Sequence, residues 1–152
     1  MEASRQALKL STPIQGYLRA ISRPTNIVAI AEDWCGDVVR HVPVLEKIAQ
    51  GSLQINVRYI LREDSKEAFV RFLTNGGEAI PKFIFFNQDF VECANWGPMP
   101  AECRELIARG KACGDVKTAR ERVATLYDAD QGLQVVIGEL VQCIDIATTT
   151  QI

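Results

Sequence analysis

Residues 26–37 read NIVAIAEDWCGD, and this stretch decides the fold. Residues 26–31 form a short apolar run rich in β-branched side chains, which is typical of a strand covered on both faces. A helix is predicted to follow at once over residues 35–50, since apolar side chains recur there at helical spacing before Gly51 supplies a stop. Cys35 therefore stands where a buried strand gives way to a helix.

The position of Cys35 bears on its chemistry. A sulfur at the start of a helix faces unpaired backbone N–H groups and the positive end of the helix dipole, and both favour a thiolate. Trp34 precedes it, and Gly36 would let a partner backbone approach closely. The alternative is a buried cysteine acting as a small hydrophobe, which is the usual role of a lone cysteine. Placement at a strand-to-helix junction favours the functional reading.

The flanking sequence predicts further elements in an alternating order. A helix is predicted over residues 13–21, a strand over 55–61, and a helix from residue 65 to Leu73 that Asn75-Gly76-Gly77 closes. Runs at 83–86 and 90–96, joined by a short loop, indicate an antiparallel hairpin. Further helices are predicted over residues 101–109, 115–127 and 133–147. Strands alternating with helices indicate an α/β fold with parallel pairing of the first two strands.

Length and composition narrow the class of protein. With 152 residues, 47% hydrophobic and 24% charged, the chain is expected to form one globular domain. A net charge of −2 argues against a nucleic-acid partner. No apolar run reaches the length of a membrane span, and the charged start of the chain does not resemble a signal peptide. We therefore expect no membrane partner and a soluble cytoplasmic location.

Five cysteines form an odd set without framework spacing, so free thiols in a reducing compartment are expected rather than structural disulfides. The absence of a C-x₂-C pair argues against a metal site. The sequence contains no glycine-rich phosphate loop, so no cofactor is expected. His41, the only histidine, lies six residues after Cys35 on roughly the opposite side of its helix. It is interpreted as a surface or packing residue and not as a general base.

Several of these features together resemble a known family. Trp34-Cys35-Gly36, a helix containing Pro43, then Ile80-Pro81, the hairpin and Gly97 resemble the thioredoxin fold over roughly residues 20–110. More narrowly, four segments resemble a bacterial branch of thioredoxin-like proteins with a Trp-Cys-Gly-Asp motif. Those segments are residues 32–37, 73–76, 80–81 and 96–98.

The resemblance implies an α/β thioredoxin-like fold: a mixed sheet of about four strands flanked by helices, with an N-terminal helix and a C-terminal helical extension. Residues 1–152 are expected to form a single domain, with a core over about 20–110 and the extension over about 111–152. No low-complexity linker separates the two parts, so the extension is expected to pack on the main domain. The C-terminal helices could also serve a partner or form a homodimer.

The resemblance also implies residue roles. Cys35 would be the nucleophile that attacks a disulfide to give a mixed disulfide. Pro81, if cis, would present the Ile80 backbone as an edge beside which a substrate chain could pair. Trp34 would form an apolar wall, and the remaining substrate-binding positions are Gly36, Asp37 and Gly97. The plainer alternatives are a proline at a strand start for Pro81 and a surface-capping aromatic for Trp34.

The sequence departs from the two-cysteine pattern at its most informative positions. Val38 occupies the place of the second cysteine of the C-x-x-C motif. The resemblance to thioredoxins places Ala29 at the strand position where they have a buried aspartate, which helps to move the proton of the second cysteine's thiol. Asp37 would partly oppose thiolate formation, and Glu32 and Asp33 add negative charge nearby. The standard two-cysteine cycle is therefore not expected.

Any resolving thiol would have to come from elsewhere in the chain or from outside it. The four other cysteines are better interpreted as core or surface thiols; they are Cys93, Cys103, Cys113 and Cys143.

The sequence is compatible with two functions from different classes. The first is a monothiol thiol-disulfide oxidoreductase in which Cys35 attacks a protein disulfide or reacts with a low-molecular-weight thiol, and an external or distant thiol completes turnover. The second is a redox-inactive thioredoxin-fold module that binds protein near Trp34 and Pro81 without exchange chemistry. Val38, Ala29 and the acidic surroundings of Cys35 motivate the second hypothesis.

Overall fold

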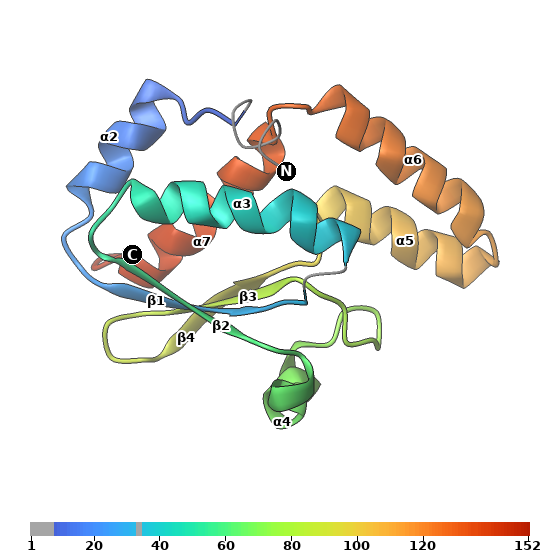
Figure 1. Cartoon of the computed structure of the whole chain (residues 1–152), viewed down its shortest axis with the longest axis horizontal. Helices are drawn as coiled ribbons and strands as arrows, with labels where there is room; N and C mark the ends of the chain where they lie inside the picture. Colours follow the sequence, from blue (N-terminus) through green and yellow to red (C-terminus); the bar gives the residue numbers. More distant parts are fainter. Residues whose placement is uncertain (1–7, 33–34) are drawn as a thin grey trace.

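The computed structural model of the chain describes residues 8–32 and 35–152. Its centre is a four-stranded mixed sheet in the order β2-β1-β3-β4. The strands are β1 (Thr25–Ile30), β2 (Ile55–Ile60), β3 (Lys82–Phe86) and β4 (Glu92–Trp96). β1 pairs in parallel with β2 and antiparallel with β3, which forms the hairpin with β4. This confirms the predicted fold class (Figure 1).

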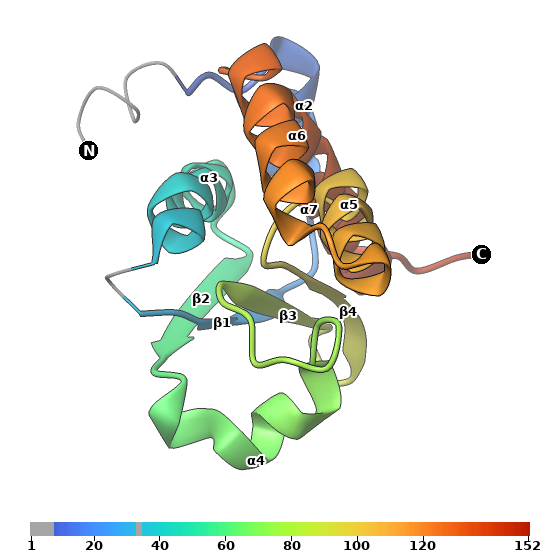
Figure 2. The same cartoon turned by 90° about the vertical axis from the view of Figure 1, so that its right-hand side faces the viewer.

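Helices cover the two faces of the sheet unequally. One face carries α2 (Thr12–Ala20), α3 (Gly36–Gln50) and α7 (Gln134–Thr148), while α4 (Lys66–Phe69) lies on the other face (Figure 2). The order β1-α3-β2 followed by the return to β3 is what brings the start of α3 to the edge where β3 begins, because parallel strands end on the same side of a sheet. Cys35 and Ile80, the residue before Pro81, therefore meet despite lying 45 positions apart, and a hydrogen bond from the Cys35 Sγ to the Ile80 carbonyl joins them.

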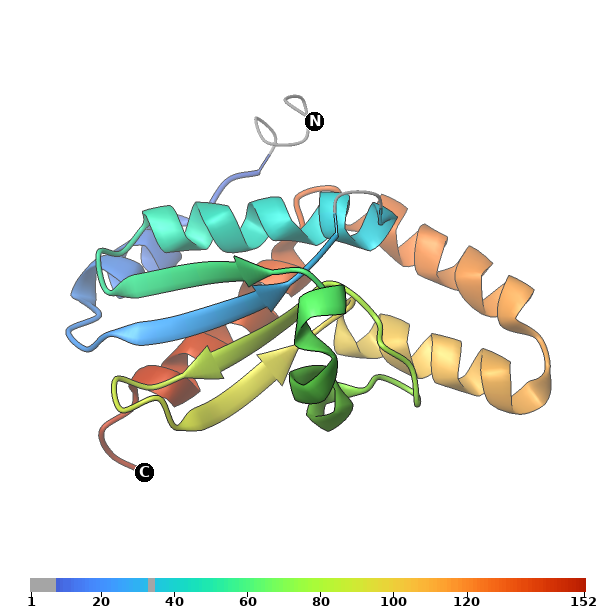
Figure 3. The same ribbon diagram turned by 60° about the horizontal axis from the view of Figure 1, so that its bottom comes forward.

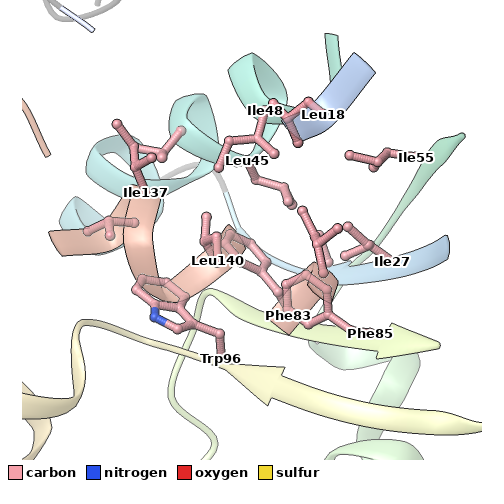
Figure 4. Close-up of a cluster of buried hydrophobic side chains, with 14 of the residues drawn as sticks. Leu18, Ile27, Leu45, Ile48, Ile55, Phe83, Phe85, Trp96, Ile137 and Leu140 are labelled. Atoms are coloured by element: carbon pink, nitrogen blue, oxygen red, sulfur yellow. The ribbon is translucent and has the colours of Figure 1, made fainter. Parts of the chain in front are cut away.

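Strand alternation divides the buried side chains into two clusters. Ile27, Phe83 and Phe85 point into the larger cluster beneath α3 and α7, where they meet Leu45, Ile137 and Leu140 (Figure 4). Ile30 and Ile84 point the other way, into a smaller cluster with Phe69 and Phe72. The sheet is thus packed on both faces, as the apolar sequence of residues 26–31 predicted.

The segment predicted as one helix from residue 65 to Leu73 is broken into three short pieces. A 3₁₀ turn (Glu63–Ser65) leads into α4, and a second 3₁₀ turn follows over Val70–Phe72. Phe69 and Phe72 are both buried in the smaller cluster. A 3₁₀ turn places residues three apart on the same side, so it brings both rings to the sheet over a short length of chain.

Two helices form a hairpin that projects beyond the sheet (Figure 3). They are α5 (Ala101–Cys113) and α6 (Val116–Ala129). Gly114 ends α5 in the left-handed conformation, with φ of 78°. Gly110 allows the helices to pack closely, because a Cβ there would come within 2.6 Å of the Ala119 Cβ. The hairpin is therefore a tightly packed unit inserted between β4 and α7.

The last helix is part of the main core. Ile137, Leu140 and Ile144 of α7 are fully buried in the larger cluster. Asp130 caps this helix through its carboxylate, which accepts hydrogen bonds from the backbone N–H groups of Gln134 and Val135. The boundary expected near residue 110, between the core and the C-terminal helical extension, lies inside α5. The apolar stripe of α7 faces the sheet of its own chain.

No helix among the described residues is both long and apolar enough to span a bilayer.

Candidate functional site

Cys35 is the N-cap residue of α3. Its backbone is extended, with φ of −84° and ψ of 131°, and its carbonyl accepts the first helical hydrogen bond from the Val39 N–H at 3.1 Å. The side chain makes no capping bond to the helix and is half-buried. Instead, the Sγ atom donates to the Ile80 carbonyl at 3.6 Å. The thiol therefore lies between the start of α3 and the chain entering β3.

The chain entering β3 contains a cis peptide bond between Ile80 and Pro81. Both residues are buried. Gly97 lies directly behind them, with φ of +125°, and its backbone approaches so closely that a Cβ there would overlap the Pro81 carbonyl oxygen. The Gly97–Pro98 bond is cis as well. Two backbone segments thus run against each other beside Cys35 with no room for a side chain at position 97.

Lys82 fastens these segments to a third. Its side chain is only 2% exposed, and its Nζ donates to the Thr74 Oγ1 at 2.7 Å and to the Gly97 carbonyl at 2.8 Å. Burial, with a smaller contribution from the nearby Arg104, lowers the pKa of Lys82 to about 8. The buried ammonium group therefore joins the loop at Thr74, which precedes β3, to the backbone at Gly97.

In front of Cys35 lies a cavity of about 290 Å³. Its first wall is the loop from Thr74 to Ile80, and its second is Pro98 with Met99. α5 forms a third wall through side chains on one of its faces, Arg104, Ile107 and Lys111. Asp37 and Arg62 complete the lining. The inserted helical hairpin thus helps to build the site.

Asp37 ties the far end of the hairpin to the start of α3. The Tyr127 hydroxyl donates to its Oδ1 at 3.0 Å. Arg40 lies 4.0 Å from the centroid of the Tyr127 ring and donates to the Tyr127 and Asp130 carbonyls at 3.3 and 3.4 Å. Burial raises the pKa of Asp37, although the Tyr127 hydrogen bond and Arg40 oppose that shift. The end of α6 is therefore anchored next to Cys35.

Removing the Tyr127 hydroxyl tests this anchor. Tyr127→Phe is expected to lower the free energy of unfolding by about 1.5 kcal/mol, because the half-buried Asp37 carboxyl loses a hydrogen-bond donor. Urea denaturation measures the change. Tyr59→Phe is the matched control, since the Tyr59 hydroxyl donates to the Glu46 carboxylate on the exposed surface and its loss should cost well under about 1 kcal/mol. Equal losses in the two variants would contradict the anchoring role.

Residues 1–120 match a family model described as thioredoxin. The chain belongs to the thioredoxin family. A comparison with curated proteins gave no match.

Two solved structures share the fold of this thioredoxin-family chain. A protein of unknown function from Pseudomonas aeruginosa aligns with a TM-score of 0.70 at 19% identity, covering 95% of this chain and 81% of the other. An HIV epitope-scaffold protein aligns with a TM-score of 0.71 at 18% identity and the same coverage of 95% and 81%. Because both identities are low, these likenesses show the fold alone.

The predicted site residues fall into three groups in the thioredoxin-family structure. Cys35, Asp37 and Ile80 line the cavity. Pro81 and Gly97 are buried behind it, and Gly36 is exposed at the first turn of α3. The predicted apolar wall, Trp34, lies outside the described residues.

Sequence reasoning missed the contribution of α5. Arg104, Ile107 and Lys111 recur at intervals of three and four residues, which places them on one helix face. That periodicity marks a common face but does not show what the face covers. Thr74 and Asn75 belong to the segment 73–76 that resembles the family, but the sequence indicated no site role for them, although both line the cavity.

The four other cysteines lie away from the cavity wall. Burial is the main cause that raises the pKa values of Cys103 and Cys143 to about 11, so both thiols stay protonated. Cys93 is half-buried, with its Sγ 3.3 Å from the Val91 carbonyl, and Cys113 is exposed at the end of α5. All five thiols are free, and Cys35 is the one cysteine among the described residues that lines the cavity.

His41 is a core residue. It is 0% exposed, and its ring meets the edges or faces of Trp96 and Tyr127 with centroid distances of 5.2 and 5.7 Å. Burial lowers its pKa to about 3, and the nearby Arg40 adds to that shift. The imidazole is therefore neutral at physiological pH, and His41 is not among the residues that line the cavity in front of Cys35. Across residues 8–32 and 35–152, no cluster of three His, Cys, Asp or Glu side chains is placed to hold a metal ion.

Proposed function

We propose that this protein is a monothiol thiol-disulfide oxidoreductase of the cytoplasm, belonging to a bacterial thioredoxin branch with a Trp-Cys-Gly-Asp motif. One observation carries the proposal: Cys35 alone among the described cysteines lines the cavity that lies at the start of α3 and beside the cis bond before Pro81. Five free thiols, two of them held protonated by burial, fit a reducing compartment.

The chemistry is a two-step exchange. The Cys35 thiolate attacks one sulfur of a disulfide, a new S–S bond forms to Cys35, and the old S–S bond breaks so that the other sulfur leaves as a thiolate. A second thiolate from solution then attacks the outer sulfur of this mixed disulfide. That attack forms the product disulfide and returns Cys35 as the thiolate.

The packing around α3 supports an external or distant second thiol. Val38 takes the place of the second cysteine, and it is only 7% exposed within the smaller hydrophobic cluster. Ala29, at the position of the aspartate that would serve such a thiol, is fully buried in the larger cluster. Both positions are thus used for packing, and the described cavity offers no internal thiol for the second step.

The test is turnover of a small disulfide by a small thiol. Wild-type protein is expected to accelerate the reduction of bis(2-hydroxyethyl) disulfide by excess glutathione, and Cys35→Ser is expected to lose that acceleration. Cys113→Ser is the matched control, because it removes an exposed thiol away from the cavity and should leave the rate unchanged. Equal rates for wild type and Cys35→Ser would overturn the proposal.

The second candidate is a redox-inactive module that binds protein at the same groove. A specific contact favours it: the Cys35 Sγ donates to the Ile80 carbonyl, and only a protonated thiol can donate that bond. Iodoacetamide labelling followed by mass spectrometry separates the two candidates. The binding module predicts that Cys35 is alkylated more slowly than the exposed Cys113 at neutral pH, whereas the oxidoreductase predicts faster alkylation of Cys35.

A further inference from the structure

The cavity in front of Cys35 has a charge pattern that the exchange chemistry alone does not require. Resting on the proposed function, we propose that this cavity is a subsite for the carboxylate of a small anionic thiol, whose disulfide is the substrate of Cys35. α5 supplies the recognising side chains. The proposal therefore gives the inserted hairpin a role in choosing the substrate.

Three cationic side chains line the cavity. Arg104 and Lys111 come from α5, and Arg62 comes from the chain after β2 on another side of the opening. Arg62 is held in position, since its Nη1 donates to the Glu78 carbonyl at 3.4 Å. The whole chain carries a net charge of −2, so this local gathering of cations runs against the overall balance. A cavity lined by one sign of charge attracts ligands of the opposite sign.

Within the described chain, the two α5 cations are not neutralised by ion pairs. No salt bridge joins Arg104 or Lys111 to a described acidic side chain, whereas Arg109 on the same helix pairs with Glu105 at 2.6 Å. The Arg104 Nε is also buried with no hydrogen-bond partner among the described residues. A buried guanidinium donor without a partner is costly, and a bound carboxylate would satisfy it.

The acidic side chains of the cavity are fewer than its cationic side chains. Asp37 is engaged by the Tyr127 hydroxyl, and burial raises the pKa of its carboxyl. Glu78 is exposed. Three cations thus face two carboxyl groups, of which one already accepts a hydrogen bond from elsewhere in the chain.

The size and the apolar part of the cavity favour a small molecule. Its volume of about 290 Å³ lies near the lower end for ligand pockets, which run from roughly 300 to 1,000 Å³. Met99 and Ile107 offer apolar surface to the carbon chain between a sulfur and a carboxylate. With the sulfur at Cys35 and the carboxylate at Arg104 or Lys111, one compact thiol would occupy the space.

The expected reaction is the first exchange step with such a molecule. The Cys35 thiolate attacks a symmetrical disulfide of the anionic thiol, leaving one half bonded to Cys35 and releasing the other half as a thiolate. The carboxylate of the bonded half then lies against the α5 cations. The second thiolate comes from solution as before.

The test uses three symmetrical disulfides of similar size and different charge. They are dithiodipropionate, which is anionic, bis(2-hydroxyethyl) disulfide, which is neutral, and cystamine, which is cationic. Mass spectrometry follows the rate at which Cys35 acquires each adduct, and the reaction of each disulfide with free 2-mercaptoethanol corrects for intrinsic reactivity. The corrected rate is expected to be highest for dithiodipropionate and lowest for cystamine.

Charge-removing variants on α5 assign the preference to this helix. Arg104→Gln and Lys111→Gln should each lower the anionic-to-cationic rate ratio by about fivefold, and added salt should lower it further. Lys111 is exposed, so its variant is expected to fold even if Arg104→Gln does not. Arg109→Gln is the matched control, because that side chain is paired with Glu105 and does not line the cavity.

The outcomes separate the subsite from the reaction. Equal corrected rates for all three disulfides, or a ratio unchanged in Lys111→Gln, would overturn the subsite while leaving the oxidoreductase proposal standing. No adduct at Cys35 with any of the three would overturn both. A ratio that favours dithiodipropionate and falls in the α5 variants supports the subsite.

Discussion

Gly97→Ala is expected to lower the free energy of unfolding by about 3 kcal/mol, because position 97 cannot hold a side chain in this fold. The residue has φ of +125°, a conformation that alanine rarely adopts. An added Cβ would also overlap the Pro81 carbonyl oxygen and come within 3.2 Å of the Lys82 Cα. Relief requires the two backbone segments to separate, which would weaken the hydrogen bond from Lys82 to the Gly97 carbonyl.

Urea denaturation with wild type and variant measures this loss. The matched control is Gly138→Ala, since Gly138 is exposed inside α7 and a Cβ there would meet nothing within 4 Å. Alanine at that helical position is expected to raise the free energy of unfolding by about 0.5 to 1 kcal/mol. A Gly97→Ala protein as stable as wild type would show that the two segments can separate at little cost.

The second large effect concerns acid. Lowering the pH from about 7 to about 4 is expected to reduce the free energy of unfolding by about 3 kcal/mol through His41 alone. Burial lowers the folded pKa of His41 from 6.5 to about 3. In the window between these values the unfolded chain binds a proton that the folded chain does not. Stability is therefore fully present above the unfolded pKa and is lost as the pH falls toward the folded one.

Replacing the imidazole by a ring that does not titrate isolates this contribution. His41→Phe keeps an aromatic ring between Trp96 and Tyr127, and urea denaturation from about pH 7 to about pH 4 should show a shallower loss than in wild type. The folded pKa of Asp37 is raised, so its protonation affects the free energy of unfolding with the opposite sign, but both proteins retain Asp37. Parallel pH profiles for the two proteins would contradict the assignment to His41.

Much of the fold could be predicted because its signals are local. The apolar run before Cys35, the helical spacing after it and the short loop of the β3–β4 hairpin each lie within a few residues. The Ile80–Pro81 pair carries part of the family resemblance, and the bond, for which the sequence left the cis form conditional, is cis in the structure. The interruption of the helix around Phe69 had no local signal in the sequence, and the buried Phe69 and Phe72 contact a cluster built by distant strands.

The candidate site was harder to predict, because it depends on contacts between distant segments. Each of α5 and α6 was expected as a helix, yet nothing local indicated that the end of α6 returns to α3. That return rests on the bond between Tyr127 and Asp37, which are 90 residues apart. Arg104 and Lys111 of α5 line the cavity because the helical hairpin of α5 and α6 lies against this part of the molecule. The charges on a helix face are visible in the sequence, but the surface that the face meets is not.

The position of α7 has a consequence for how the chain folds during synthesis. Ile137, Leu140 and Ile144 pack in one cluster with Phe83, Phe85 and Trp96, so the part of this sheet face that α2 and α3 do not cover stays uncovered until almost the whole described chain has left the ribosome. Contacts between β1 and α7 join segments more than a hundred residues apart, and such distant pairings slow folding. A sheet that forms in the nascent chain before α7 is synthesised would therefore leave these apolar side chains accessible to chaperones and to other chains.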